Sequence, residues 1–202
     1  MERMFYELQE VLAQPGCPLC FLRYDTERRY FDTLFYELVN DYETRQKVIH
    51  SGGFCPEHTA FIFQERHLVL GIAIIYHDLL GHTLTSPTSE THCPLCAHWR
   101  EKESHLFRLL EKQWGSLHEH WGKQTFFCQL HLRTITNERL KEEITQYTRQ
   151  ALQEIRTQLT ELIEKFDYRH AYLPLSPGIE WSWQEALEFF ASRTLIRERH
   201  KR

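Results

Sequence analysis

All six cysteines of the chain stand in four short motifs, and each motif has the spacing of a metal-ligand pair. Two motifs read Cys-Pro-Leu-Cys and two read Cys-x-x-His. In both patterns, two side chains that bind soft or borderline cations are offered from one turn, as in tetrahedral zinc sites. We therefore predict that the motif residues bind metal. They are Cys17, Cys20, Cys55, His58, Cys93, Cys96, Cys128 and His131.

The four motifs form an internal repeat. The Cys-Pro-Leu-Cys motifs lie 76 positions apart and the Cys-x-x-His motifs 73 positions apart, with gaps of 34 and 31 residues inside the two repeats. Each repeat therefore offers one closed Cys3His set, which predicts two structural zinc ions, because four protein ligands leave no position for a reactive water. The predicted sets are Cys17, Cys20, Cys55 and His58 in the first repeat, and Cys93, Cys96, Cys128 and His131 in the second.

Several alternatives to this zinc assignment stay open on the sequence alone. Three cysteines and a histidine can also hold an iron–sulfur cluster, and cysteines can simply be buried. Covalent haem attachment is excluded, because it needs Cys-x-x-Cys-His and the residues after the two motifs are Phe21 and Ala97. Other histidines stand near enough in the sequence to replace a predicted histidine ligand, namely His92, His98, His118 and His120.

Helical periodicity fills most of the sequence between the motifs. Apolar residues at helical spacing predict helices from about residue 18 to 39, from about 56 to 81 and from 138 to 166. The proline of each Cys-Pro-Leu-Cys fits the first turn of a helix, and Ser182 with Glu185 reads as a capping box for a last helix. No alternating pattern of useful length favours a strand. We therefore expect an all-α fold.

The predicted organisation follows the repeats. Residues 1–82 make the first Cys3His helical repeat and residues 83–136 the second, with a turn-rich boundary between His82 and His92. Residues 137–202 supply the long helix and a C-terminal segment, which we expect to pack on the repeats as one compact unit.

Taken together, these motifs resemble a bacterial family that is catalogued only as a domain of unknown function. The resemblance rests on the two cysteine units, on the run Gly71 to Leu80 and on a late Lys-Phe-Asp-Tyr-Arg motif at residues 165–169. It supports the helical fold and the cysteine assignment but implies no activity. In the late motif, we expect Asp167 and Arg169 to make ion pairs and Tyr168 to anchor the C-terminal segment.

Composition and charge exclude other classes of protein. The longest apolar run, Leu68 to Ile75, is far shorter than the roughly 20 residues that a membrane helix needs. The amphipathic, acid-containing N-terminus is unlike a secretion signal, so we expect a cytoplasmic protein. The net charge of −4 gives no general attraction to nucleic acid. A short basic tail is the one local exception, with Arg193, Arg197, Arg199, Lys201 and Arg202.

The function that these observations favour is a non-catalytic, zinc-stabilised interaction module with a protein partner. A redox or zinc sensor is the main alternative, because zinc-bound thiolates can be oxidised to disulfides with release of the metal. An enzyme with a site of histidines and carboxylates, and a nucleic-acid binder that uses the basic tail, are further alternatives. No phosphate-binding loop or nucleophile motif is present, and no cysteine remains outside the four motifs.

Overall fold

The protein is helical, and its helices divide into two compact units. The computed structural model describes residues 2–64, 66–86, 92–166, 176 and 178–193, and over these residues it contains helices and one isolated bridge but no strand. Unit 1 comprises Met1–Tyr24 and His105–Arg202, and unit 2 comprises Asp25–Ser104. The units do not follow the predicted boundaries at residues 82 and 136, because each unit combines segments of both sequence repeats.

Each ligand motif stands at the beginning of a helix. Helices α2 (Pro18–Asp32) and α6 (Pro94–Leu117) begin at the prolines of the two Cys-Pro-Leu-Cys motifs. Helices α4 (Pro56–Ile62) and α7 (Gln129–Thr134) begin directly after the first cysteines of the two Cys-x-x-His motifs. Proline is favoured at such positions because its fixed φ matches a helix and its missing N–H would have no partner there. The predicted helix starts in the Cys-Pro-Leu-Cys motifs are confirmed.

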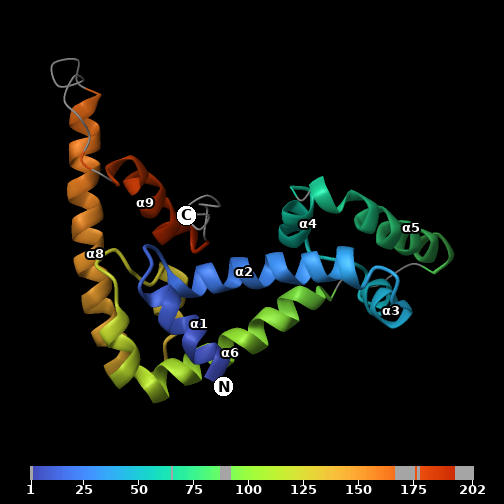
Figure 1. Cartoon of the computed structure of the whole chain (residues 1–202), viewed down its shortest axis with the longest axis horizontal. Coiled ribbons are helices and arrows are strands. Elements are labelled where there is room, and N and C mark those ends of the chain that lie inside the picture. Colours follow the sequence, from blue (N-terminus) through green and yellow to red (C-terminus); the bar gives the residue numbers. More distant parts are fainter. Residues whose placement is uncertain (1, 65, 87–91, 167–175, 177, 194–202) are drawn as a thin grey trace. The chain divides into compact units, whose positions relative to one another are not determined.

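Unit 1 is built around a long helix. This helix, α8 (Glu138–Lys165), ends within one residue of the prediction, and the side chain of Asn137 caps it by accepting from the Leu140 N–H. The terminal helix α9 (Ser182–Ala191) packs on α8 (Figure 1). The unit also contains α1 (Glu2–Leu12), η3 (His118–His120), η4 (Ile179–Trp181), α7, the start of α2 and the end of α6.

The predicted cap of α9 is wrong. Ser182 is the first residue inside α9, and Trp181 takes the capping position without a side-chain hydrogen bond. The Ser182 hydroxyl instead donates to the carbonyl of Ile179, at 2.8 Å. The short helix η4 runs directly into α9, so Ser182 already has helical backbone angles and cannot cap.

Unit 2 packs its helices around the second half of α2. A π-helical turn, η1 (Thr33–Glu37), follows α2, and Asp41 then caps α3 (Tyr42–His50). The predicted single helix over residues 56–81 is divided into α4, η2 (Arg66–Leu68) and α5 (Val69–Thr85). Phe61 and Leu68, one on each side of this division, are both buried. The fully buried Phe31 ring is the centre of the core and contacts the rings of Phe35, Phe54 and Phe61.

No helix in the described ranges has the length and apolar character that crossing a membrane would require. Residues 167–169 of the late motif lie outside the described residues, as does the basic tail beyond Arg193. The predicted ion pairs and the anchoring role of Tyr168 are therefore still predictions.

A close backbone contact in unit 2 gives a direct test of this packing. Gly71 of α5 lies against the backbone of Phe35, so that a Cβ at position 71 would overlap the Phe35 carbonyl oxygen. We expect Gly71→Ala to lower the free energy of unfolding by about 2 kcal/mol or more, because backbone atoms must move apart. Chemical denaturation of the purified variant measures this change.

Gly81 supplies the matched control on the same helix. It is exposed and a Cβ there would have no neighbour within 4 Å, so Gly81→Ala should stabilise the protein by about 0.5–1 kcal/mol through helix propensity alone. Equal midpoints for the two variants would contradict the close approach of α5 to Phe35.

Candidate metal centre

The eight predicted ligands form two groups of four, which we call cluster 1 and cluster 2. In cluster 1, Cys17, Cys20, Cys128 and His131 come together; in cluster 2, Cys55, His58, Cys93 and Cys96 come together. Within each cluster the candidate ligand atoms all lie within 4.8 Å of one another. The eight predicted ligands therefore gather in two groups, but the predicted pairing of motifs is wrong. Metal binding by these residues stays a prediction.

The pairing crosses the repeats instead of closing within them. Each Cys-Pro-Leu-Cys motif meets the Cys-x-x-His motif of the other repeat. The reason is the long helix that follows Cys20. At a rise of about 1.5 Å per residue, α2 carries the chain far from the first motif before it can turn back. The aromatic contacts of Phe31 then hold the segment with Phe54 and His58 against the second half of α2.

Short backbone contacts bring the motifs together in unit 1. The segment before Cys17 lies beside the segment before Cys128 through a bridge between Gly16 and Thr125. The Gly16 N–H donates to Gln124 at 3.1 Å, and the Phe126 N–H donates back to Gly16 at 3.2 Å. The Thr125 hydroxyl is buried and donates to the carbonyls before the first motif, so this register is fixed by side chain as well as backbone.

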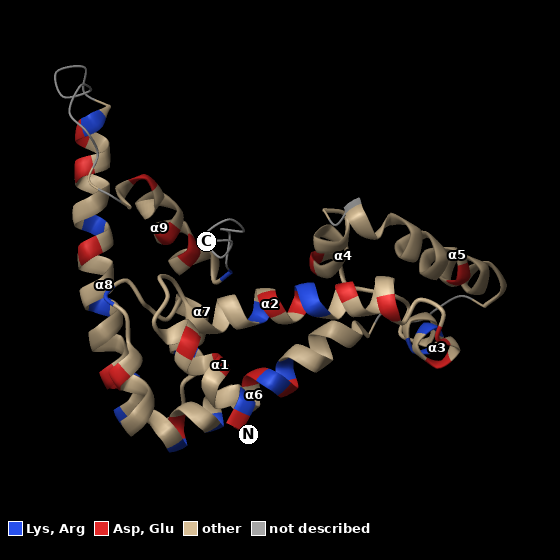
Figure 2. Cartoon of the chain, viewed as in Figure 1, with Lys and Arg blue, Asp and Glu red and all other residues tan. Residues whose placement is uncertain are grey.

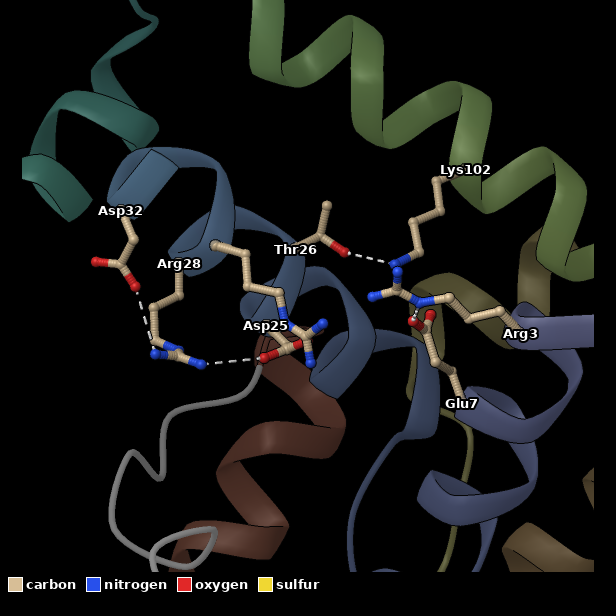
Figure 3. A network of polar contacts seen from close by, with 8 residues as sticks. Arg3, Glu7, Asp25, Thr26, Arg28, Asp32 and Lys102 are labelled. Atoms are coloured by element: carbon tan, nitrogen blue, oxygen red, sulfur yellow. Dashed lines mark hydrogen bonds and ion pairs between the residues drawn. The ribbon is translucent and has the colours of Figure 1, made fainter. Parts of the chain in front are cut away.

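A corresponding backbone contact occurs in unit 2. The N–H of His92, one residue before Cys93, donates to the carbonyl of Ser51, shortly before Cys55, at 3.0 Å. Helix α6 is held against α2 nearby, where Lys102 donates to the hydroxyl of Thr26 at 3.0 Å (Figure 3). In both clusters, therefore, hydrogen bonds just ahead of the ligands set which motifs meet.

Distances within the clusters match the edges of a tetrahedron around one zinc ion. Zn–S bonds of about 2.3 Å and Zn–N bonds of about 2.05 Å imply edges of about 3.8 Å between sulfurs and about 3.5 Å between sulfur and nitrogen. The Sγ atoms of Cys20 and Cys128 are 3.6 Å apart, and those of Cys55 and Cys96 are 3.7 Å apart. The Nδ1 of His131 lies 3.0–3.5 Å from three sulfurs and that of His58 lies 3.2–3.4 Å from three.

Within each cluster, the cysteines shift one another's pKa values in opposite directions. In cluster 1, hydrogen bonds from Cys17 and Cys20 lower the pKa of Cys128, while the hydrogen bond to Cys128 raises the pKa of Cys20. In cluster 2, burial opposes ionisation of Cys93, but the hydrogen bonds from His58 and from the backbone of Cys55 and Cys96, together with the charge of His58, outweigh it and lower the Cys93 pKa to about 6. Burial and the Cys55 hydrogen bond raise the Cys96 pKa to about 12. One thiolate in a cluster therefore keeps a neighbouring thiol protonated, and a divalent ion is what would let all three ionise.

Glu27 lies beside cluster 2 and was not predicted from the sequence. Its carboxylate lies 3.1 Å from Nε2 of His58, and both side chains are only 1% exposed. With Nδ1 facing the sulfurs, the Nε2–H donates to Glu27, an arrangement that fixes the tautomer and ring orientation of metal-binding histidines. The repeat contained a signal for this residue: a glutamate stands seven positions after each Cys-Pro-Leu-Cys, at Glu27 and Glu103.

Burial opposes protonation of His58, but the hydrogen bonds to Cys93 and Glu27 outweigh it and raise the His58 pKa to about 10. A metal ion bound at Nδ1 would take the place of that proton.

The other four histidines that were considered as ligands lie elsewhere. His92 and His98 are exposed. The Nδ1 of His118 lies 3.0 Å from the Trp114 carbonyl, and the Nε2 of His120 lies 2.6 Å from the Gln9 amide nitrogen. Among the described residues, His58 and His131 are the histidines that join the cysteines.

A polar cavity of about 500 Å³ in unit 1 is where histidine and carboxylate side chains gather apart from the clusters. Its lining includes Trp114, His118, Arg139 and Glu143. The Trp114 N–H and Arg139 donate to Glu143 and lower its pKa, so this carboxylate stays ionised and is a poor general acid. Glu143 is therefore not the tuned general acid that the enzyme alternative requires.

Comparison with known proteins places the chain beside uncharacterised relatives. The model of a family of unknown function, DUF6062, matches residues 7–92. The resemblance to an uncharacterised family is confirmed. The DUF6062 match includes Cys17, Cys20, Cys55 and His58 and stops just before Cys93.

A curated relative of similar length is also uncharacterised. It is described as an uncharacterised 23.9 kDa protein in the xynA 3′ region of Caldicellulosiruptor sp. (strain Rt8B.4). The two sequences are 27% identical over 204 aligned residues, which cover 90% of this chain and 98% of the relative. No solved structure matches the chain.

The crossed pairing predicts which double substitutions leave one intact site. Cys20→Ser with Cys128→Ser removes two ligands from cluster 1 only, so one tightly bound metal per chain should remain. Cys20→Ser with Cys55→Ser damages both clusters, so no tightly bound metal should remain. Metal analysis after dialysis against a weak chelator measures both, and pairing within the repeats would give the reverse result.

Proposed function

We propose that each cluster binds one zinc ion and that the protein is a zinc-stabilised helical module without catalytic metal. The observation that carries this proposal is the agreement between the cluster distances and the edges of a tetrahedral ZnS3N site, found twice in one chain. Both clusters use the same donor set, and both stand where helices begin.

Zinc fits the donor set better than the alternatives. Three thiolates with one imidazole are typical of zinc, whereas calcium and magnesium prefer oxygen ligands. An iron–sulfur cluster would place several metal and sulfide atoms between the protein ligands and would hold the thiolates farther apart than single-ion edges. The observed Sγ separations of 3.6 and 3.7 Å favour a single ion.

Four protein ligands support a structural role. A closed tetrahedral site has no open position for a water or a substrate. The unfolded chain has no preformed set of ligands, so binding energy at each site stabilises the folded state. A reducing cytoplasm is the compartment that we propose, because it keeps the six thiols available for metal.

The partner that we propose is another protein with an uncharged, apolar surface. The support is the outer face of α4 and α5, where Phe63, Leu70 and Leu84 are more than 75% exposed. Asp78 is the one charged residue on α5 when the histidines are neutral, and α5 is almost entirely tan in Figure 2. The carboxylate of Asp78 is paired with Arg45. A groove of about 480 Å³ between α4 and α5 is lined by Phe63, Val69 and Tyr76 among others. Apolar surface of this kind, without charged groups, fits an apolar protein surface better than nucleic acid.

Metal removal tests the structural role. The purified protein should contain about two zinc ions per chain, and a strong chelator should lower its helicity and its melting temperature. An ion present at 1,000 times its dissociation constant contributes about 4 kcal/mol. At roughly 2–4 °C per kcal/mol, each site should therefore raise the midpoint by about 10 °C. Circular dichroism with elemental analysis measures both, and a folded, metal-free protein with an unchanged midpoint would contradict the proposal.

The partner surface can be tested in cells with a photo-crosslinking residue. Placed at exposed Leu70, it should capture one protein species, and Leu84→Asp should abolish that product while leaving the zinc content unchanged. Lys112, an exposed residue of α6, is the control position and should give no such product. The same products from both positions, or a product that survives Leu84→Asp, would count against this face.

A further inference from the structure

The two clusters differ in how well solvent can reach their sulfur atoms. The four side chains of cluster 1 are at most 3% exposed. In cluster 2, Cys93 and His58 are buried, but Cys55 and Cys96 are only half-buried. Thiolates react with soluble oxidants according to their accessibility. Small molecules in water can therefore reach the sulfur atoms of cluster 2 more easily than those of cluster 1, although the donor sets are the same.

The three sulfurs of cluster 2 also differ from one another. The Cys93 sulfur is buried and accepts hydrogen bonds from the backbone N–H groups of Cys55 and Cys96. Hydrogen bonds of this kind occupy lone pairs and make a thiolate a weaker nucleophile. The accessible sulfurs, Cys55 and Cys96, come from different helix starts and lie 3.7 Å apart. A disulfide of about 2.05 Å needs only a short closing movement of these two side chains.

We infer that Cys55 and Cys96 are the peroxide-reactive pair of this protein, oxidised by a hydroperoxide to a disulfide with release of the zinc ion from cluster 2. This inference rests on the proposed zinc function, and it assigns a redox response to one site alone.

The reaction needs only the hydroperoxide as oxidant. One zinc-bound thiolate of the pair attacks a peroxide oxygen, so an S–O bond forms, the O–O bond breaks and hydroxide, or an alkoxide, leaves. The sulfur is now a sulfenic acid, oxidised by two electrons, and the peroxide has been reduced. The second thiolate attacks this sulfur; the S–S bond forms, the S–O bond breaks and the hydroxide that leaves takes up a proton from solvent to become water. Zinc, left with two of its four protein ligands, dissociates.

The consequence is a change at cluster 2 that leaves cluster 1 loaded. The disulfide would still join the start of α4 to the start of α6, so the metal link is exchanged for a covalent link. His58 keeps its buried partner Glu27. A thiol reductant with added zinc would restore the site, because a disulfide is reversible by exchange.

Zinc release from the full-length, zinc-loaded protein tests this directly. Hydrogen peroxide is added, released zinc is followed with a chromogenic chelator, and disulfides are mapped by differential alkylation and mass spectrometry. One zinc per chain should be released in a first phase that is about tenfold or more faster than any second phase, since the cluster 1 sulfurs are shielded. The mapped product should be Cys55–Cys96, with Cys17, Cys20 and Cys128 still reduced.

Two variants serve as matched controls. Cys20→Ser with Cys128→Ser keeps only cluster 2 and should release its single zinc at the fast rate. Cys55→Ser with Cys96→Ser keeps only cluster 1 and should hold its zinc through the same exposure. Simultaneous loss of both ions from the wild type, a first disulfide within cluster 1, or a disulfide that uses Cys93 would overturn the inference. A protein that carries two zinc ions but releases neither would defeat this inference alone, whereas a protein purified without zinc would defeat the proposed function.

Discussion

Convergence of helix starts at the cysteine clusters is the constraint on which the rest of the structure depends. Each cluster brings together the beginnings of two helices, α2 with α7 and α6 with α4. Helix N-termini carry partial positive charge, so thiolates are well placed there. The backbone hydrogen bonds just before the ligands, at Gly16 and at His92, fix which helix starts meet. The lengths of the helices, the packing of the core and the membership of the two clusters are all consistent with this meeting of helix starts.

Crossed pairing makes the two repeats dependent on each other. Because each cluster takes two ligands from each repeat, neither repeat can complete a site alone. The two compact units also depend on both repeats, since each unit includes segments of both. Formation of the clusters must therefore close long loops, and the binding energy of the proposed ions would offset part of the entropy of that closure. This requirement favours a structural role for metal at both clusters.

The sequence was sufficient to predict the helical class and the eight residues that gather, but not their pairing. Residue types and two-residue spacings were enough to single out the eight residues that gather in the clusters, and the prolines predicted two of the helix starts. Pairing could not be read from spacing, because 34 residues separate Cys20 from Cys55 and 34 also separate His58 from Cys93. The unbroken helical pattern after Cys20 was the usable signal, since a long rod cannot return its end to its start. Glu27 was missed because a carboxylate in a charged, amphipathic helix looks like surface until its burial is known.

Zinc-edge X-ray absorption of the protein as purified is the most direct test of the central claim. We predict about two zinc ions per chain, each with three sulfur neighbours at about 2.3 Å and one nitrogen neighbour at about 2.0–2.1 Å. In a variant that retains one intact cluster, the zinc content should fall to about half, with the same sulfur and nitrogen neighbours. A folded protein without metal, or zinc bound mainly by oxygen and nitrogen, would contradict the account.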